Sequence, residues 1–172
     1  MRRINSPYHA RFLTFSTYRR LPLFEEVWIR DAFVEQLRLT RVRHPLSLYA
    51  WVLMPEHVHL LLHERATGRL DGVLKTLKIG LAKRVLSVWR SERSVVLDSI
   101  LDDAGRQRFW QRGGGYDRNI FTSEEFAEKF RYIHLNPVRR GLVKFPEEWK
   151  WGSARWWAGR REGEIECDYY GR

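Results

Sequence analysis

Residues 46–63, with the sequence LSLYAWVLMPEHVHLLLH, decide the fold predicted for this chain. Two runs dominated by apolar side chains flank the short interruption Pro55-Glu56. Short apolar runs separated by a proline-containing break are typical of adjacent strands joined by a tight connection. The sequence therefore predicts neighbouring strands at 46–54 and 57–63.

The second of these strands carries histidines at alternate positions. Because side chains two residues apart share a face of a strand, ~6.6–6.8 Å apart, His57 and His59 are expected to point the same way. Val58, Leu60 and Leu62 would fill the opposite face and anchor it to a core. Two neutral imidazoles at this spacing can bind one divalent metal ion. A lone His-x-His pair is more often only a polar strand face, so the metal interpretation needs support from the rest of the chain.

The remaining elements are arranged around these two strands. Apolar and aromatic residues predict a first strand at 10–18 and, at helical spacing, helices at 25–43 and 70–89. Residues 95–101 are compatible with a short strand, and residues 109–111 read as the last strand. A third helix is expected to begin at Thr122, whose capping box with Glu125 is typical of a helix N-terminus, and to end at Asn136-Pro137.

The order strand, helix, strand, strand, helix, strand predicts an α+β fold, the ferredoxin-like split βαβ sandwich with a central antiparallel sheet and helices on one face. A C-terminal extension rich in Trp and Arg would follow. We expect a single domain over residues 1–158 and a C-terminal tail over 159–172. His57 and His59 would then project from the middle of the open face of the sheet. An RNA-recognition domain of the same topology has base-stacking aromatic residues there instead.

Composition and charge restrict the classes of partner. The chain has 172 residues, with 31 Lys and Arg against 21 Asp and Glu and a net charge of +10, which favours a polyanionic partner such as nucleic acid. No apolar run approaches the ~20 residues of a membrane span, so we expect no membrane partner. The N-terminus lacks the apolar core of a signal peptide, and Cys167 is the single cysteine. These features predict a cytoplasmic protein without an internal disulfide.

Several basic residues are candidates for binding a nucleic-acid backbone. Lys75 and Lys78 lie on neighbouring turns of the helix predicted at 70–89, and Arg139 and Arg140 follow the third helix. Arg155 precedes two tryptophans whose rings could stack on unpaired bases. Solvated cationic surfaces are about as common an explanation for such groups, and tryptophans mostly fill cores.

A tyrosine stands directly after three consecutive glycines at 113–115. Glycines allow positive φ angles and a close approach of the backbone to a ligand, and they permit movement. Tyr116 follows them, and Asp117, Arg118 and Asn119 come next. Taken without its context, such a tyrosine would be a surface or loop residue.

Four blocks of sequence make that context more specific. They are residues 12–24, MPEHVH at 54–59, FWQ at 109–111 together with Tyr116-Asp117, and YIHLNPVRRGLV at 132–143, which is followed by WKWGSA at 149–154. In combination these blocks resemble the REP-associated tyrosine transposases, a branch of the single-tyrosine HUH endonucleases. The resemblance covers nearly the whole chain.

The resemblance implies a ferredoxin-like domain that cleaves and rejoins single-stranded DNA beside hairpins of repetitive extragenic palindromes. It implies that His57 and His59 are metal ligands and that Tyr116 is the nucleophile. Many relatives carry a histidine two places after the tyrosine, where this chain has Arg118, which becomes a candidate DNA-binding residue. Asn119 is the first candidate for the third ligand, since it lies one turn from Tyr116 if that segment is helical, and Asp117 is the second.

The expected function is that of a metal-dependent endonuclease and transesterase that forms a 5′-phosphotyrosine intermediate. The cofactor would be Mg²⁺ or Mn²⁺. Glu56 and Asp117 are candidates for orienting the ligands through hydrogen bonds, and a plain turn residue is an equal alternative for Glu56. The alternatives are a non-catalytic protein that binds structured DNA or RNA and a metal-dependent nuclease that uses water. The expected partners are single-stranded DNA and DNA hairpins, with no protein partner, in a nucleoid-associated setting. A monomer is favoured over a dimer.

Overall fold

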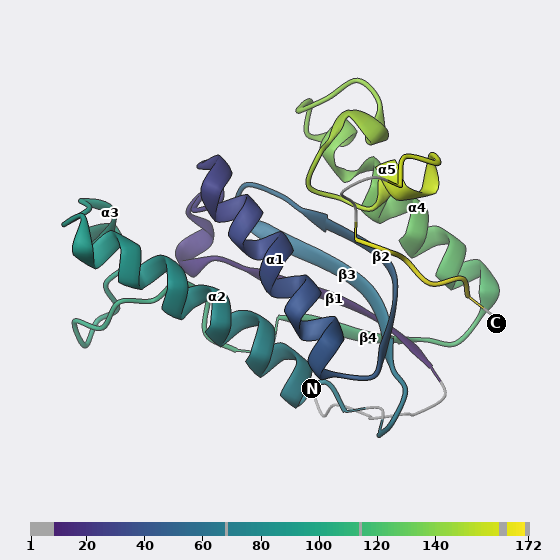
Figure 1. The fold of residues 1–172 in the computed structure, drawn as a ribbon, viewed down its shortest axis with the longest axis horizontal. Helices are drawn as coiled ribbons and strands as arrows, with labels where there is room; N and C mark the ends of the chain where they lie inside the picture. Colours follow the sequence, from purple (N-terminus) through teal and green to yellow (C-terminus); the bar gives the residue numbers. More distant parts are fainter. Residues whose placement is uncertain (1–8, 68, 114, 162–164, 171–172) are drawn as a thin grey trace.

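A four-stranded antiparallel sheet forms the centre of the computed structural model, which describes residues 9–67, 69–113, 115–161 and 165–170 (Figure 1). The order of the strands across the sheet is β2-β3-β1-β4. β3 pairs with β2 on one side and with β1 on the other, so it is an interior strand. The strands are β1 (Ala10–Ser16), β2 (Leu46–Leu53), β3 (His57–Glu64) and β4 (Tyr116–Ile120).

Long helices connect the strands in the order expected for a split βαβ fold. α1 lies between β1 and β2, α2 lies between β3 and β4, and α4 follows β4. The helices are α1 (Val27–Arg43), α2 (Asp71–Ser91), α3 (Val96–Ser99), α4 (Ser123–Arg139) and α5 (Ala154–Trp157), with short 3₁₀ turns η1 (Tyr18–Arg20) and η2 (Pro146–Glu148). The predicted α+β fold with its antiparallel sheet is therefore confirmed.

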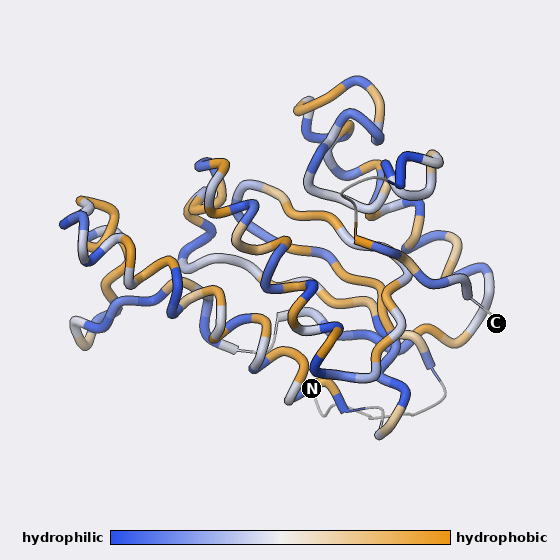
Figure 2. The backbone as a smooth tube through the Cα atoms, in the orientation of Figure 1, coloured by the Kyte–Doolittle hydropathy of each residue, from blue (hydrophilic) through white to orange (hydrophobic). Residues whose placement is uncertain are grey.

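The two faces of the sheet pack against different helices. Val58, Leu60 and Leu62 of β3 are buried in the larger core together with residues of α1 and α2, as their alternation predicts. Leu61 lies in a second, smaller core that includes Ile133 of α4. Figure 1 shows α1 and α2 over one face of the sheet, and Figure 2 shows the apolar stretches of the strands beneath them. α4 thus departs from the expectation that the helices share one face.

Three predicted elements differ from the structure. Residues 95–101 contain the short helix α3 rather than a strand. Residues 109–111 contribute only an isolated bridge between Trp110 and Thr17, and the last strand is β4 instead. The third helix begins after Thr122, whose side chain accepts a hydrogen bond from the backbone of Glu125 as expected, but it continues through Pro137 to Arg139. Proline is tolerated there because the helix ends within a turn and loses only one backbone hydrogen bond.

The outer edge of β2 is covered by C-terminal segments. The backbone of Leu48 donates to the Asp168 carboxylate at 2.7 Å, and the Asp168 backbone donates to the Leu48 carbonyl at 2.8 Å. Trp51 donates its backbone N–H to Ser153 Oγ at 2.9 Å. These contacts explain why all residues of an edge strand are buried. They also show that residues 165–170, part of the predicted tail, pack against the domain.

No helix within the described residues is long and apolar enough to cross a membrane.

Candidate active site

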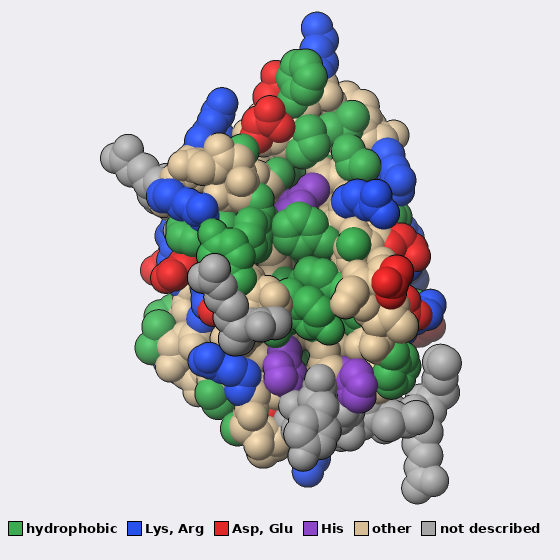
Figure 3. All heavy atoms as spheres, turned by 90° about the vertical axis from the view of Figure 1, so that its right-hand side faces the viewer, with side chains coloured by type: hydrophobic (Ala, Val, Ile, Leu, Met, Phe, Trp, Pro, Cys, Tyr) green, Lys and Arg blue, Asp and Glu red, His purple; other side chains and the backbone are tan. Residues whose placement is uncertain are grey.

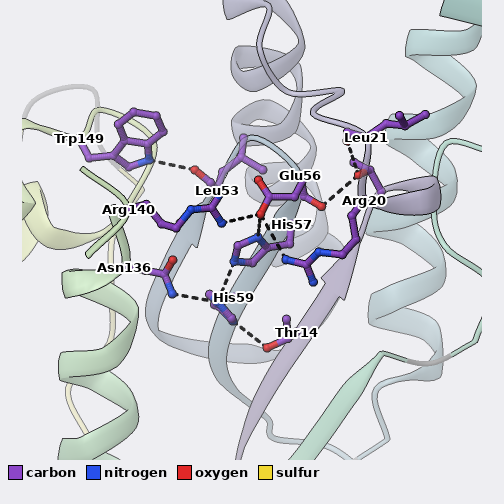
Figure 4. A network of polar contacts seen from close by, with 11 residues as sticks. Thr14, Arg20, Leu21, Leu53, Glu56, His57, His59, Asn136, Arg140 and Trp149 are labelled. Atoms are coloured by element: carbon purple, nitrogen blue, oxygen red, sulfur yellow. Dashed lines mark hydrogen bonds and ion pairs between the residues drawn. The ribbon is translucent and has the colours of Figure 1, made fainter. Parts of the chain in front are cut away.

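His57 and His59 lie on an interior strand with both rings turned toward the same point. The Nε2 atoms of the two rings are 3.0 Å apart (Figure 4). His59 Nδ1 is 2.7 Å from Thr14 Oγ1 of β1, and Thr14 is its partner across the strand pair. His57 Nδ1 donates to the carboxylate of Glu56 at 2.9 Å. The Nδ1 contacts fix both rings so that their Nε2 atoms face each other.

Both imidazoles are buried, with 5% and 4% of their surfaces exposed. Burial lowers the pKa of His59 to about 3. Burial also lowers the pKa of His57, although the Glu56 carboxylate opposes this change. Both rings are therefore neutral at pH 7 and can offer nitrogen lone pairs to a ligand.

Glu56 is placed to orient His57, as the sequence predicts. Its carboxylate also accepts a hydrogen bond from Arg140 at 2.8 Å and from Arg20 at 3.3 Å. Burial alone would raise the pKa of Glu56, but the contacts with Arg140 and His57 outweigh burial, so the pKa lies below its ordinary value. The carboxylate therefore stays ionised and stabilises the Nδ1–H tautomer of His57.

Asn136, a residue that the sequence did not single out for this site, reaches the histidines from α4. Its amide Nδ2 is 3.2 Å from His59 Nε2 and the residue is buried. His59 Nε2 cannot donate to His57 and at the same time accept from Asn136. This conflict disappears if the amide is turned so that Oδ1 takes the place of Nδ2, because three acceptor atoms then surround one point that a cation can occupy.

The geometry of these residues fits a divalent metal ion. Ligand atoms at right angles around an ion with bonds of about 2.1 Å are about 3.0 Å apart, which matches the distance between the two Nε2 atoms. Within the described residues, no group of three His, Cys, Asp or Glu side chains could hold a metal. Beside the two imidazoles, Asn136 is a side chain in position to offer an amide oxygen to an ion.

Asn119 and Asp117 do not lie near the histidines. The segment after Tyr116 is strand β4 rather than a helix, so alternate residues point to opposite faces of the sheet. Asn119 pairs with Arg11, and Asp117 pairs with Leu13, whose side chain is in the core beneath α1 and α2. The Asp117 carboxylate binds Arg11 at 2.6 Å. The structure therefore corrects the expectation that Asn119 is the third ligand and that Asp117 supports the site.

An open cavity of about 590 Å³ extends from the histidines across the sheet. Among the described residues that line it, four are Arg or Lys and none is Asp or Glu. The lining residues are Phe12, Thr14, Arg20, His57, His59, Tyr116, Lys129, Tyr132, Asn136, Arg139 and Arg140. Such a cavity attracts anions, and it is large enough for a segment of a polymer chain.

Two tyrosines, Tyr116 and Tyr132, line this cavity. Tyr116 lies at the start of β4, half-exposed, with its ring 6.0 Å from that of Phe12. Tyr132 lies on α4, and its ring is 5.2 Å from the ring of His59. Tyr132 is also four residues before Asn136, so both project from the same side of the helix. The helical spacing of Tyr132 and Asn136 within YIHLNP is the sequence signal for this pair.

Gly115 explains the position of Tyr116. Its φ of +68° is in the left-handed region, and a Cβ atom there would lie 2.0 Å from the carbonyl oxygen of Thr14. Only glycine fits this close approach of β4 to β1. The central glycine of the triplet, at 114, lies outside the described residues.

The predicted DNA-binding residues are divided between the two faces. Arg139 and Arg140 line the cavity, and Arg118 lies beside it in an ion pair with Glu125. Lys75 and Lys78 are on α2, over the opposite face, where Lys78 Nζ lies 5.2 Å from the Phe15 ring centroid. Arg155 is on α5, away from the cavity, and the neighbouring Trp157 donates to the carbonyl of Tyr49 at 3.0 Å.

The tryptophans beside Arg155 therefore pack toward the edge of β2 rather than stand free for bases. On the face seen in Figure 3, Lys and Arg side chains gather around the margins and hydrophobic side chains cross the middle. Lys and Arg side chains are thus spread over the surface, and some of them line the cavity beside the histidines.

Comparison with known proteins supports the resemblance seen in the motifs. No family model matches the chain. The REP-associated tyrosine transposase of Escherichia coli (strain K12) is 26% identical over 110 residues, which is 63% of this chain. The matched region spans only 54% of the length of that relative.

A solved structure of a REP-associated tyrosine transposase bound to a REP hairpin is similar over 100% of this chain and 91% of that one. Its TM-score is 0.72 and its sequence identity is 18%, a likeness that concerns the fold. Together the two comparisons confirm the resemblance to the REP-associated tyrosine transposases, whose fold this chain shares.

Proposed function

We propose that this chain is a DNA-cleaving and DNA-rejoining enzyme of the transposase type, which acts on single-stranded DNA beside a hairpin. The observation that carries the proposal is the convergence of His57 Nε2, His59 Nε2 and the Asn136 amide in a basic cavity that also contains tyrosines. The likeness to a protein solved with a REP hairpin supports a hairpin as the substrate.

His57, His59 and Asn136 would hold Mg²⁺ or Mn²⁺. When bound, the metal ion would neutralise charge on the non-bridging oxygens of the scissile phosphate. The chain's own contribution is to keep both imidazoles neutral and their lone pairs directed at one point, through the contacts of Thr14 and Glu56. Two nitrogen ligands favour Mn²⁺ over Mg²⁺.

The nucleophile we propose is Tyr132 rather than Tyr116. The ring of Tyr132 contacts the histidine pair, with 5.2 Å between its centroid and that of His59, and Tyr132 shares a helical face with Asn136. The ring of Tyr116 contacts that of Phe12, and its hydroxyl interacts with Arg118. α4 would therefore supply both the nucleophilic phenol of Tyr132 and the amide of Asn136 that would bind the metal ion.

The reaction exchanges one phosphate ester for another. The Tyr132 hydroxyl oxygen forms a bond to phosphorus and gives up its proton, the bond from phosphorus to the 3′-oxygen breaks, and that oxygen leaves as a 3′-hydroxyl after taking up a proton. The 5′-phosphate remains on the tyrosine. Because the number of ester bonds is unchanged, attack by a 3′-hydroxyl reverses the step and rejoins a strand without a nucleotide cofactor.

The proposal is tested with labelled DNA hairpins that carry randomised single-stranded flanks. Protein, hairpins and Mn²⁺ are incubated and separated on a denaturing gel, with a chelator control. A covalent protein–DNA band that requires the metal is the expected result. Free fragments would indicate hydrolysis by water, and binding without either product would indicate a DNA-binding protein that does not cut.

A further inference from the structure

The short turn η1, which leads from β1 toward α1, holds two consecutive arginines in a strained backbone conformation. Arg19 has a φ of 51° and Arg20 a φ of 54°, both in the left-handed region. Residues with a Cβ atom rarely adopt this backbone conformation, and two such residues in succession are less common still. Such strain persists where surrounding contacts hold it and is concentrated at functional sites.

The contacts that hold this turn tie it to the residue before His57. The Thr17 backbone N–H donates to the Glu56 carbonyl at 3.0 Å, and Thr17 Oγ1 donates to the Leu21 carbonyl at 2.6 Å. The Arg20 backbone N–H donates to the Thr17 carbonyl at 3.1 Å, and that of Arg19 to Gln111 Oε1 at 3.0 Å. The position of Arg20 relative to the histidine pair is therefore fixed.

The two arginine side chains go to different places. Arg20 lines the cavity beside the histidines, and its Nη2 is 3.3 Å from Glu56 Oε1. The Arg19 guanidinium lies 5.0 Å from the Tyr18 ring and 3.7 Å from the exposed Asp103 carboxylate. The side chains are similarly exposed, 61% for Arg20 and 59% for Arg19. The chain thus contains two arginines of matched backbone, charge and exposure, of which one faces the cavity.

Arg20 shares its carboxylate with Arg140. The Arg140 Nη1 atom is 2.8 Å from Glu56 Oε1, the oxygen that Arg20 also contacts, and Figure 4 shows the two arginines reaching Glu56 from opposite sides. Glu56 is 9% exposed in its side chain, whereas Arg140 is 49% exposed. Because the imidazoles are neutral, the cluster of Arg20, Arg140 and Glu56 carries a net charge of +1. Each guanidinium has five N–H donors, and the contact with Glu56 uses one nitrogen of each.

We propose that Arg20 and Arg140, held in place by Glu56, form a clamp for a single DNA phosphate next to the phosphate that the histidine pair receives. The planar donor fork of arginine suits a phosphate, and Glu56 keeps the two forks together without neutralising them. The strained turn serves to deliver Arg20 to this position. The inference rests on the proposed function only in that a DNA strand lies in the cavity.

The test compares Arg20→Gly with Arg19→Gly. Both variants lose one positive charge, and both relieve a left-handed φ, so only the position of the side chain differs. Binding of a DNA hairpin with single-stranded flanks is measured with chelator present, over a range of salt concentrations. We expect Arg20→Gly to weaken binding roughly tenfold or more at low salt and to reduce the slope of log K against log salt by ~0.7, the value for one phosphate contact on a single strand. Arg19→Gly should leave the slope unchanged.

Two results would overturn the clamp. One is an unchanged slope for Arg20→Gly, and the other is an equal loss for Arg19→Gly, which would attribute the effect to the turn rather than to Arg20. If a glycine variant fails to fold, Arg20→Asn and Arg19→Asn repeat the comparison, since asparagine tolerates the left-handed region. Because binding is measured without metal and without cleavage, absence of a covalent product would refute the proposed function while leaving the clamp standing.

Discussion

Asn136 and His59 are 77 residues apart in the chain, and their side chains meet with 3.2 Å between Nδ2 and Nε2. This contact joins α4 to the interior strand β3 and brings an amide to the histidine pair. α4 is therefore the element that brings a third polar side chain to the histidines. The sequence had predicted that the segment around Asn119 would do so.

Replacement of Asn136 by alanine should weaken Mn²⁺ binding by about 10- to 100-fold, because one of the three proposed protein ligands is lost. Asn119→Ala is the matched control, since Asn119 lies on β4 and points to the opposite face. Isothermal titration with Mn²⁺ measures both. Equal loss in the two variants, or a loss confined to Asn119→Ala, would contradict Asn136 as the third ligand.

Thr14→Val should weaken Mn²⁺ binding by about 10-fold, because His59 loses the hydroxyl that orients its ring at Nδ1. The two side chains have nearly the same shape, so the change mainly removes a hydrogen bond, at a cost of about 1 kcal/mol in the free energy of unfolding. Thr40→Val also removes a buried hydroxyl, one that donates to the Gln36 carbonyl within α1. It should lower stability similarly and leave Mn²⁺ affinity unchanged, and a parallel fall in affinity would count against a specific role for Thr14.

Gly115→Ala should be much more destabilising than Gly105→Ala. The φ angles are +68° and +70°, so both variants pay the same backbone strain, about 1–2 kcal/mol. A Cβ at 105 meets no atom within 4 Å, whereas one at 115 meets the Thr14 carbonyl oxygen at 2.0 Å. Urea denaturation should show an additional loss of ~2 kcal/mol or more for Gly115→Ala. Equal losses would mean that β4 does not approach β1 as described.

Stability should fall as the pH is lowered from about 6.5 to 4, in part because of His134. Burial lowers the pKa of His134 to about 4, while an unfolded histidine titrates near 6.5. Between these values the unfolded state binds the proton and the folded state does not, so acid favours unfolding. The shift corresponds to roughly 3 kcal/mol.

His134→Gln can keep a contact with Ser153 Oγ, which lies 2.8 Å from His134 Nε2, and has no proton to gain. The free energy of unfolding of this variant should depend less steeply on pH between 4 and 6.5 than that of the parent. Identical pH slopes in urea denaturation would show that the fold does not keep His134 neutral in this pH range.

The elements whose apolar spacing is strong were predictable from the sequence. The second and third strands and the helices α1 and α2 agree with the structure to within about two residues at each end, and Thr122 caps α4 as expected. The pairing of His57 with His59 follows from strand geometry alone, since side chains two apart must share a face.

β4 could not be recognised because its sequence, YDRNI, has little apolar character. It is an edge strand whose residues are mostly exposed or half-exposed, and its position depends on pairing with β1 far away in the chain. The error at Asn119 follows directly, because a helix and a strand place that residue on different sides of the sheet. The spacing of Tyr132 and Asn136 indicates locally that they share a helical face, but their approach to the histidines depends on the packing of α4 against β2 and β3, which is a tertiary contact.

The proposed site is tested most directly by identifying the tyrosine that becomes covalently attached to DNA. The metal-dependent covalent complex of the unaltered protein is digested, and the peptide that bears the nucleotide is sequenced by mass spectrometry, with Tyr132→Phe and Tyr116→Phe analysed alongside. We predict that the nucleotide is on Tyr132, that Tyr132→Phe abolishes the complex, and that Tyr116→Phe still forms it. A nucleotide on Tyr116, or a complex that survives Tyr132→Phe, would contradict the arrangement of histidines, amide and phenol described for this site.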